Sequence, residues 1–189
     1  MEAITLDTLK KMLVSRKVEA EEFVKVQGPQ DTTAYTFGGI LILFSTKSRL
    51  SAGDPQKFME FADENSHRLG IIVVTQNRLS ETVEAALNAI VSNPENQLIQ
   101  VFEYRHLQFD ISKHVKVPQH RILSSEERDA VMREFNIPST AHMPKIDWKD
   151  AMARWIGSRP GDIVEISGMC ETSVQNRRYR FCIADVING

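Results

Sequence analysis

The side chains that could carry out catalysis are few and lie far apart in the sequence. Histidines occur without the HxxxH or HExxH spacing and without a paired cysteine, so a metal site is a weak hypothesis. The five are His67, His106, His114, His120 and His142. Adjacent carboxylates, such as Glu21 with Glu22 and Glu126 with Glu127, point apart on a helix and are typical of solvated faces.

A metal-dependent nuclease would need acidic side chains and a lysine gathered at strand ends. Asp162 and Glu165 are near each other, but residues three apart in a strand point to opposite faces. The GxSxG, GxGxxG and GxxxxGK[ST] motifs are absent, so serine hydrolysis and nucleotide binding lose their usual anchors. We therefore expect no catalytic residue, no metal and no cofactor.

The remaining polar groups favour protein contacts. His114 and His120 flank a segment centred on Pro118, and we expect them to hydrogen-bond backbone groups there or to line a contact surface. Arg180 follows Arg177 and Arg178 and lies in a predicted strand, where we expect its guanidinium to meet a protein carboxylate.

Two residue types leave alternatives open. Cys170 and Cys182 have no CxxC spacing and are expected to be ordinary buried or half-buried thiols. For Trp148 and Trp155 we favour a position in the core over a position at an interface by about two to one, although tryptophan is enriched at interface centres.

Composition is that of a globular chain of one large or two small domains. The chain has 189 residues, 42% hydrophobic and 25% charged, with a net charge of −2 that argues against a freely acting basic nucleic-acid binder. Residues 1–112 carry a net −4 and residues 113–189 a net +2. The longest apolar run, Ile40–Phe44, is too short to span a bilayer. The first twenty residues are charged throughout and do not resemble a secretory signal. Because the chain has only two cysteines and no readable disulfide framework, we expect a reducing intracellular compartment.

The first half alternates helical and strand patterns, which predicts an α/β layer with a parallel or mixed sheet. Asp54 is expected to cap a helix with Pro55 in its first turn, and Ser80 to cap the next. Gly38 and Gly39, inside the first predicted strand, indicate a bulge or a close backbone approach. The expected first helix is about Leu6–Val24, and the expected strands are Tyr35–Phe44, Ile71–Val74 and Leu98–Phe102.

The pattern changes near residue 112 to a compact α+β module with a hairpin-like end. Ser124 and Glu127 form a capping box, and the helix that they open is expected to bury Val131 and Phe135. Asp147 is expected to cap a second short helix that Gly157 closes. The expected extended segments are Val115–Arg121, Asp162–Ile166 and Tyr179 to about Asp185.

Several short motifs in this second half resemble one family in their order. Ile111–His120 (ISKHVKVPQH) resembles the H-x-L-V-P-x-H segment of the fifth-largest subunit shared by eukaryotic nuclear RNA polymerases, a family that also has an archaeal member. Further along, this sequence has matches to the family's helix opening, L-P-R-I, D-P-V-A-R-Y-x-G and S-E-T-A/S. In that order they are Ser124–Glu127, Met143–Ile146, Asp150–Gly157 and Cys170–Ser173. Gly161–Ile166 and Tyr179-Arg180 are two further segments that keep the family's order.

The first half resembles the same family more loosely. Ile71–Asn77 is similar to its central strand and T-P-S-A turn, and Gln97–Leu107 to the approach to the module boundary. Glu81 stands where the family has a proline, Arg16-Lys17-Val18 replaces R-G-Y, and Val174-Gln175-Asn176 lacks the usual glycine. These departures indicate a divergent copy: a paralogue dedicated to one polymerase, or a viral version.

The resemblance implies an α/β N-terminal jaw module over residues 1–112, with an endonuclease-like sheet and no active site, and a small α+β assembly module over residues 113–189, similar to the archaeal member. It implies a non-catalytic subunit of a DNA-directed RNA polymerase that docks on the largest subunit, near other small subunits and downstream duplex DNA. No membrane or small-molecule partner is implied. The implied location is the nucleus, the nucleolus for a copy dedicated to ribosomal-RNA synthesis, or the cytoplasm for a viral copy.

The resemblance also selects candidate contact residues for the largest subunit, with internal packing an equal alternative for the aliphatic ones. They are His114, Val117, Pro118, His120, Met143, Pro144, Ile146, Arg154, Trp155, Glu171, Thr172, Tyr179 and Arg180. The DNA-facing loop comprises Gln76, Asn77, Arg78, Ser80 and Glu81. Because a carboxylate repels phosphate, Glu81 predicts weak direct DNA contact. A free-standing transcription cofactor that shares the assembly module is the alternative function, and a nuclease is a more remote one.

Overall fold

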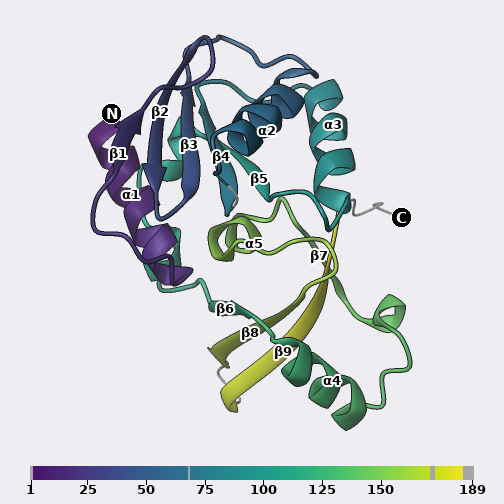
Figure 1. Ribbon diagram of the computed structural model, residues 1–189. Coiled ribbons are helices and arrows are strands. Elements are labelled where there is room, and N and C mark those ends of the chain that lie inside the picture. The colour runs from purple at the N-terminus through teal and green to yellow at the C-terminus, as the bar shows by residue number, and fades with distance from the viewer. Residues whose placement is uncertain (1, 68, 171–172, 185–189) are drawn as a thin grey trace. The chain divides into compact units, whose positions relative to one another are not determined.

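The computed structural model describes residues 2–67, 69–170 and 173–184, except for the side chains of residues 169, 170 and 173–175. The chain forms two compact units, Met1–Asp110 and Ile111–Gly189 (Figure 1). Each unit is built on its own sheet, so the expected mixture of α and β structure is confirmed. No helix in the described ranges has the length and apolar character that crossing a membrane requires.

The N-terminal unit holds a five-stranded sheet in the order β1-β2-β3-β4-β5 (Figure 1). Its strands are β1 (Val24–Val26), β2 (Thr32–Phe37), β3 (Ile40–Ser45), β4 (Gly70–Thr75) and β5 (Ile99–Glu103). The pairs β1–β2 and β2–β3 are antiparallel, whereas β3–β4 and β4–β5 are parallel. The prediction of a mixed sheet is therefore confirmed. Helices α1 (Glu2–Ser15), α2 (Asp54–Glu64) and α3 (Glu81–Ser92) complete the unit.

Helices cover both faces of this sheet, since every residue of β3 and β4 is buried. On one face the ring of Phe44 packs edge-on against Tyr35, with ring centroids 5.7 Å apart. The Tyr35 hydroxyl donates to Glu2 of α1 at 2.9 Å, which places α1 on that face. Helices α2 and α3 contact each other and strands β4 and β5. This arrangement explains the continuous apolar runs of the central strands.

Two predictions for the start of the chain are wrong. The segment predicted as one strand is a hairpin, because Gly38 and Gly39 both take positive φ, 54° and 83°, and turn β2 into β3. The first helix ends at Ser15, and the chain leaves it through Lys17 at φ 62°. The Val18 N–H then bonds back to the Leu13 carbonyl at 3.1 Å, which closes the helix well before Val24.

The cap predicted for the second helix is wrong, whereas the cap position predicted for the third helix is confirmed. Gly53 is the N-cap of α2, and Asp54 is its first residue. The Asp54 carboxylate is buried and accepts from the Ser51 N–H at 2.7 Å and from Lys47 Nζ at 3.0 Å. Ser80 is the N-cap of α3 but makes no side-chain capping bond; its hydroxyl lies 3.0 Å from that of Thr82.

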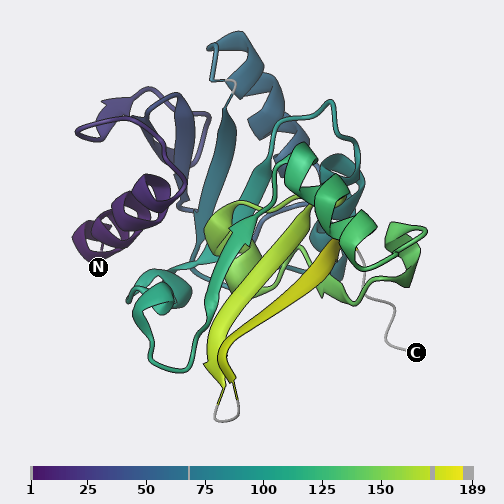
Figure 2. The same ribbon diagram turned by 90° about the horizontal axis from the view of Figure 1, so that it is seen from below.

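The C-terminal unit holds a four-stranded sheet in the order β6-β8-β9-β7. Its elements are β6 (Gln119–Ile122), α4 (Ser125–Glu134), β7 (Lys145–Asp147), α5 (Ala151–Ile156), β8 (Ile163–Cys170) and β9 (Ser173–Ile183). Strands β8 and β9 form a long antiparallel hairpin, which Figure 2 shows running side by side. Both strands extend beyond their predicted bounds. Short 3₁₀ turns lie at Ile111–Lys113 and Thr140–His142 of this unit, and at Tyr104–Leu107 of the N-terminal unit.

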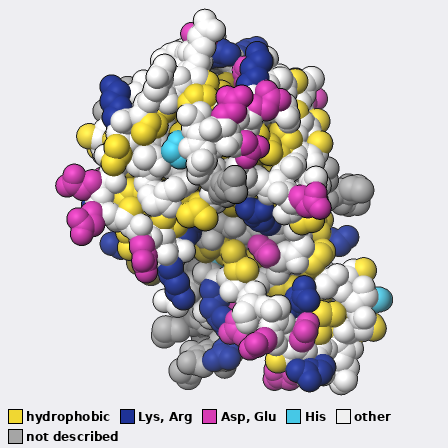
Figure 3. All heavy atoms as spheres, in the orientation of Figure 1, with side chains coloured by type: hydrophobic (Ala, Val, Ile, Leu, Met, Phe, Trp, Pro, Cys, Tyr) yellow, Lys and Arg dark blue, Asp and Glu magenta, His cyan; other side chains and the backbone are white. Residues whose placement is uncertain are grey.

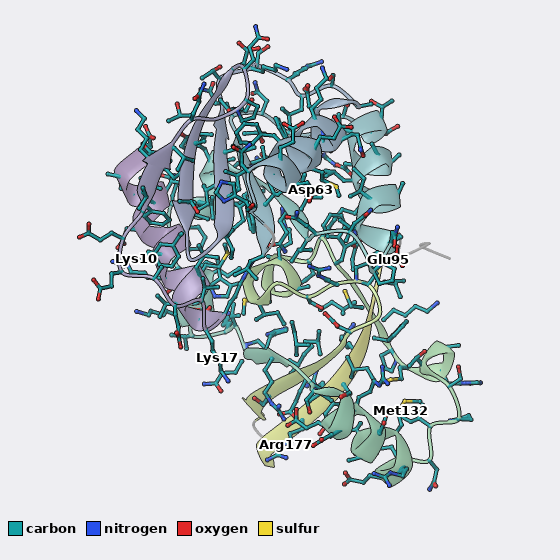
Figure 4. All side chains as sticks on the ribbon, viewed as in Figure 1. Lys10, Lys17, Asp63, Glu95, Met132 and Arg177 are labelled. Atoms are coloured by element: carbon teal, nitrogen blue, oxygen red, sulfur yellow. The ribbon has the colours of Figure 1, made fainter. Side chains whose placement is uncertain are left out.

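Helix α4 covers one face of this sheet. Leu123, Val131, Met143 and Ile163 form the buried cluster there, and Met132, which Figure 4 labels on α4, packs against it. Phe135 was expected in this core, but it is 54% exposed because it lies at the end of the helix.

The caps of α4 and α5 test the local sequence rules. The Ser124–Glu127 capping box is confirmed, with the Glu127 N–H donating to the Ser124 hydroxyl at 3.2 Å and the Ser124 N–H to the Glu127 carboxylate at 2.9 Å. Asp150, not Asp147, caps α5: its carboxylate accepts from the Met152 N–H at 2.8 Å. Asp147 lies in β7. The prediction that Gly157 closes this helix is confirmed by its φ of 77°.

The geometry of the β2–β3 turn predicts that adding one methyl group at Gly38 destabilises the protein strongly. In Gly38→Ala, the new Cβ would lie 2.5 Å from Val18 Cγ1 at a φ that L-residues disfavour, so we expect a loss of about 2 kcal/mol in the free energy of unfolding. Gly53→Ala is the matched control, since nothing lies within 4 Å of a Cβ there. Urea unfolding followed by far-ultraviolet circular dichroism measures both. Equal stability of the two variants would contradict the assignment of the turn.

Candidate functional site

The chain that leads into β6 carries the first group of candidate contact residues. His114 is exposed, and its Nδ1 accepts from the Lys116 N–H at 3.2 Å. His120 is half-buried, and its Nδ1 lies 2.8 Å from the Pro118 carbonyl oxygen. The expectation that both histidines bond backbone groups is therefore confirmed. Val117 and Pro118 are half-buried between them.

The strand register decides which candidates share a face. His120 is opposite Ile166 of β8, and Ile166 is opposite Arg178 of β9, so these three side chains lie on one face. Arg180, two residues further along β9, lies on the same face. Tyr179 lies on the other face, where its ring packs against Phe135 with centroids 5.7 Å apart. The candidate residues are thus divided between two faces of the sheet.

Pro118 and Arg180 contact the ends of this sheet. A Cβ on Gly168 would lie 3.1 Å from Pro118 Cβ, so the proline ring packs on the glycine. Arg180 Nη1 donates to the Lys145 carbonyl oxygen at 3.0 Å. The contact found for Arg180 is thus a backbone carbonyl within the unit, where we had expected a carboxylate.

Three of the candidate residues are buried inside the C-terminal unit. Met143, Ile146 and Trp155 are 4%, 7% and 3% exposed, so the alternative of internal packing describes their place in this chain. Trp148, 2% exposed, is also a core residue, as expected for both tryptophans.

The other candidates of this unit are more accessible. Pro144 is exposed and Arg154 is half-buried. Glu171 and Thr172 lie outside the described residues, as does the side chain of Cys170.

An ion-pair network that the sequence did not predict holds β6 to α4 and β8. Arg121 donates to Glu127 at 2.7 Å and to Glu165 at 3.0 Å. Glu165 is only 8% exposed, so Arg121 is the counter-ion of a buried carboxylate. Hydrogen bonds that Arg121 donates to Glu127 and Glu165 raise the pKa of Arg121. The Ser124 N–H and then Arg121 lower the pKa of Glu127. Nothing local in the sequence links residues 121 and 165.

The second candidate surface is the loop between β4 and α3. Gln76, Asn77, Arg78, Ser80 and Glu81 are all exposed, so the whole loop is available for contact. Asn77 Nδ2 donates to the Ser48 carbonyl at 2.8 Å, which joins this loop to the one that follows β3. Because the carboxyl ends of adjacent parallel strands lie at one edge of a sheet, the loops after β3 and β4 could have been predicted to lie close together.

The loop after β3 adds cations that the sequence analysis did not include. Lys47 and Arg49 belong to it, and Lys47 is paired with the buried Asp54. Burial alone would raise the pKa of Asp54, but hydrogen bonds from Ser51 and Lys47 outweigh it and hold that pKa below its ordinary value. On the face of the molecule seen in Figure 3, basic and acidic side chains are interspersed.

The buried ionisable groups do not converge. No group of three or more His, Cys, Asp and Glu side chains placed to hold a metal ion occurs among the residues that the structure describes. Burial raises the pKa of Asp162 above its ordinary value. Burial also raises the pKa of Cys182 to about 11, which keeps this fully buried thiol protonated and unreactive near neutral pH.

Comparison with known proteins identifies what the second unit resembles. Residues 109–182 match the family model described as RNA polymerase Rpb5, C-terminal domain. The DNA-directed RNA polymerase subunit Rpo5 of Pyrococcus abyssi is 40% identical over 78 residues, which cover 41% of this chain and 94% of the archaeal protein.

Eukaryotic relatives extend the similarity toward the N-terminus. The rpabc1 subunit of DNA-directed RNA polymerases I, II, and III of Dictyostelium discoideum is 26% identical over 170 residues, covering 90% of this chain and 81% of that protein. The DNA-directed RNA polymerase V subunit 5A of Arabidopsis thaliana is 27% identical over 111 residues, covering 59% of this chain and 47% of that subunit.

The Arg121 network predicts that removing the Arg121 guanidinium alone destabilises the C-terminal unit. In Arg121→Met, Glu165 loses its counter-ion; because Arg121 itself is half exposed, we expect unfolding to become about 1–2 kcal/mol easier. Arg128→Met is the control, since Arg128 pairs with exposed Asp129 on the same helix. Both tryptophans lie in this unit, so their fluorescence during urea unfolding reports it. The double variant Arg121→Met with Glu165→Met should recover most of the loss, and failure to recover would argue against this pairing.

Proposed function

This chain belongs to the family of the RNA polymerase subunits Rpb5 and Rpo5, and from that membership we propose that it is a non-catalytic subunit of a DNA-directed RNA polymerase. One observation carries the proposal. The matched segment, residues 109–182, coincides with the compact unit Ile111–Gly189, and the archaeal subunit consists almost entirely of the same segment. The part of the chain that its relatives share is therefore a structural unit with its own core.

We propose that residues 113–189 are an assembly module that docks on the largest subunit of the polymerase, next to other small subunits. The accessible candidates, His114, Val117, Pro118, His120, Pro144, Arg154, Tyr179 and Arg180, supply the contact surface in this proposal. Buried Met143, Ile146 and Trp155 support that surface from inside the unit. Glu171 and Thr172 remain candidates. A partly apolar centre with histidines and arginines around it is the composition of a stable protein interface.

We propose that residues 1–112 form part of the jaw beside downstream DNA. The loop from Gln76 to Glu81 would face the duplex, with the loop of Ser48 beside it. Glu81 begins α3 and adds negative charge where phosphates would approach. This half therefore acts as a wall that guides DNA with little direct binding.

The cellular location follows from the enzyme in which the chain works. A subunit of a eukaryotic polymerase acts in the nucleus, or in the nucleolus if it serves ribosomal-RNA synthesis. A viral copy could also act in the cytoplasm. The departures at Arg16-Lys17-Val18 and Glu81 support the proposal of a divergent copy.

Co-purification tests the subunit proposal against a free-standing cofactor. The tagged full-length chain should remain stoichiometric with the largest polymerase subunit through a wash in high salt, because a desolvated interface resists screening. Quantitative mass spectrometry of the eluate measures the ratio. A matched purification of an unrelated tagged nuclear protein sets the background. Loss of the largest subunit in the wash would favour the cofactor.

The jaw proposal predicts feeble DNA binding by the isolated chain. Because Glu81 opposes phosphate, we expect duplex DNA to bind with a dissociation constant above about 1 µM at moderate salt. Glu81→Gln should tighten binding about two- to fivefold, whereas Glu60→Gln, on the exposed side of α2, should not. A filter-binding assay measures these constants. Sub-micromolar binding by the wild type would contradict the proposal, and cleavage of plasmid DNA with magnesium would favour the nuclease.

A further inference from the structure

Strand β6 is an edge of the four-stranded sheet, and no strand of the described chain pairs with its outer side. The Leu123 N–H donates to the Ile163 carbonyl of β8 at 2.9 Å. In an antiparallel ladder such bonded pairs recur at every second residue, so Arg121 and Gln119 also direct their backbone groups to β8. The N–H and C=O groups of His120 and Ile122 therefore point to the open edge.

We propose that this edge binds an extended, acidic segment of the polymerase's largest subunit as a fifth strand of the sheet. The inference rests on the proposed function and adds the mode of docking. Strand addition satisfies the unpaired backbone groups of an edge, and side chains of the added strand then contact their neighbours on each face.

The edge offers an uninterrupted run of backbone groups. Pro118 lies before the strand and not in it, so every residue of β6 keeps its backbone N–H. The one charged residue of β6, Arg121, is engaged by Glu127 and Glu165 and is held against its own unit. What β6 offers to a partner is therefore backbone, with half-buried His120 and Ile122 on one face.

The charge around the edge selects an acidic partner. The segment from residue 113 to residue 120 carries Lys113 and Lys116 and not one carboxylate, whereas Arg121 is already paired with Glu127 and Glu165. Lys116 is exposed, and Val115 beside it is 99% exposed. A segment with apolar residues opposite His120 and Ile122, and with carboxylates near Lys116, complements this edge in both shape and charge.

A backbone substitution at His120 separates strand pairing from side-chain contact. His120→Pro removes the outward N–H, which an edge strand tolerates because that N–H has no partner in the sheet. His120→Ala is the matched control, since it removes the same side chain and keeps the N–H. Each variant is expressed with a differently tagged wild-type chain, and the ratio of the two in purified polymerase is measured. We expect His120→Pro to be incorporated about tenfold less than His120→Ala.

The outcomes are distinct. Equal incorporation of the proline and alanine variants, at the wild-type ratio or at a common lower one, would overturn strand addition. Absence of the wild type itself from the polymerase would overturn the proposed function, on which the inference rests. Tryptophan fluorescence during urea unfolding establishes that the proline variant is folded.

Amide exchange gives a second measurement that needs no substitution. In the isolated chain, the Arg121 and Leu123 amides should exchange slowly and the His120 and Ile122 amides fast. In the assembled polymerase, the latter two should slow by at least about tenfold. Unchanged exchange at His120 and Ile122 on assembly would overturn the proposal.

The acidic character of the segment has its own test. Lys116→Glu should lower incorporation several-fold, and Lys57→Glu, at an exposed site on α2, should not. Equal behaviour of the two lysine variants would overturn the acidic assignment.

Discussion

The C-terminal unit depends on the position of β8 between β6 and β9. Through this central strand, Ile163 contributes to the core under α4, Val164 lies fully buried on the opposite face, and Glu165 meets Arg121. A shift of one residue in this register would exchange the two faces, removing Ile163 from the core under α4 and separating Glu165 from Arg121. The same register also sets which amides of β6 remain unpaired. The stability of the unit and the open edge proposed for docking therefore depend on the same strand register.

Arg121 connects three elements through one side chain. It lies in β6, stays protonated at neutral pH, and bonds the first turn of α4 and the middle of β8 at once. Glu127 contributes twice, because its carboxylate also completes the capping box of α4. The helix start is thus fixed to the edge strand, and the edge is held rigid before any partner arrives. Rigidity of this kind lowers the conformational cost of binding.

Local features of the fold could be predicted, and non-local ones could not. The capping box at Ser124 and the closing glycine at Gly157 follow from neighbours within a few residues, and both are present. Asp54 and Asp147 were assigned as caps because acidic residues near a helix start look alike in sequence; Gly53 and Asp150 hold those positions. The Gly38-Gly39 hairpin was missed because its two-glycine turn places β2 directly before β3, with no polar loop to separate the two extended segments. The Arg121–Glu165 pair spans 44 residues and left no local signal.

The two units use their sheets in opposite ways. In the N-terminal unit the central strands are buried on both faces, so the accessible groups beside them lie in loops such as those at the carboxyl ends of the parallel strands, where Asn77 bonds Ser48. In the C-terminal unit β6 has alternating exposed and half-buried residues and an unpaired side. Loops carrying mixed charge suit a surface that DNA passes without being held, whereas a cationic sheet edge suits a permanent protein contact. The proposed division between a jaw and an assembly module would use these different accessible parts of the two sheets.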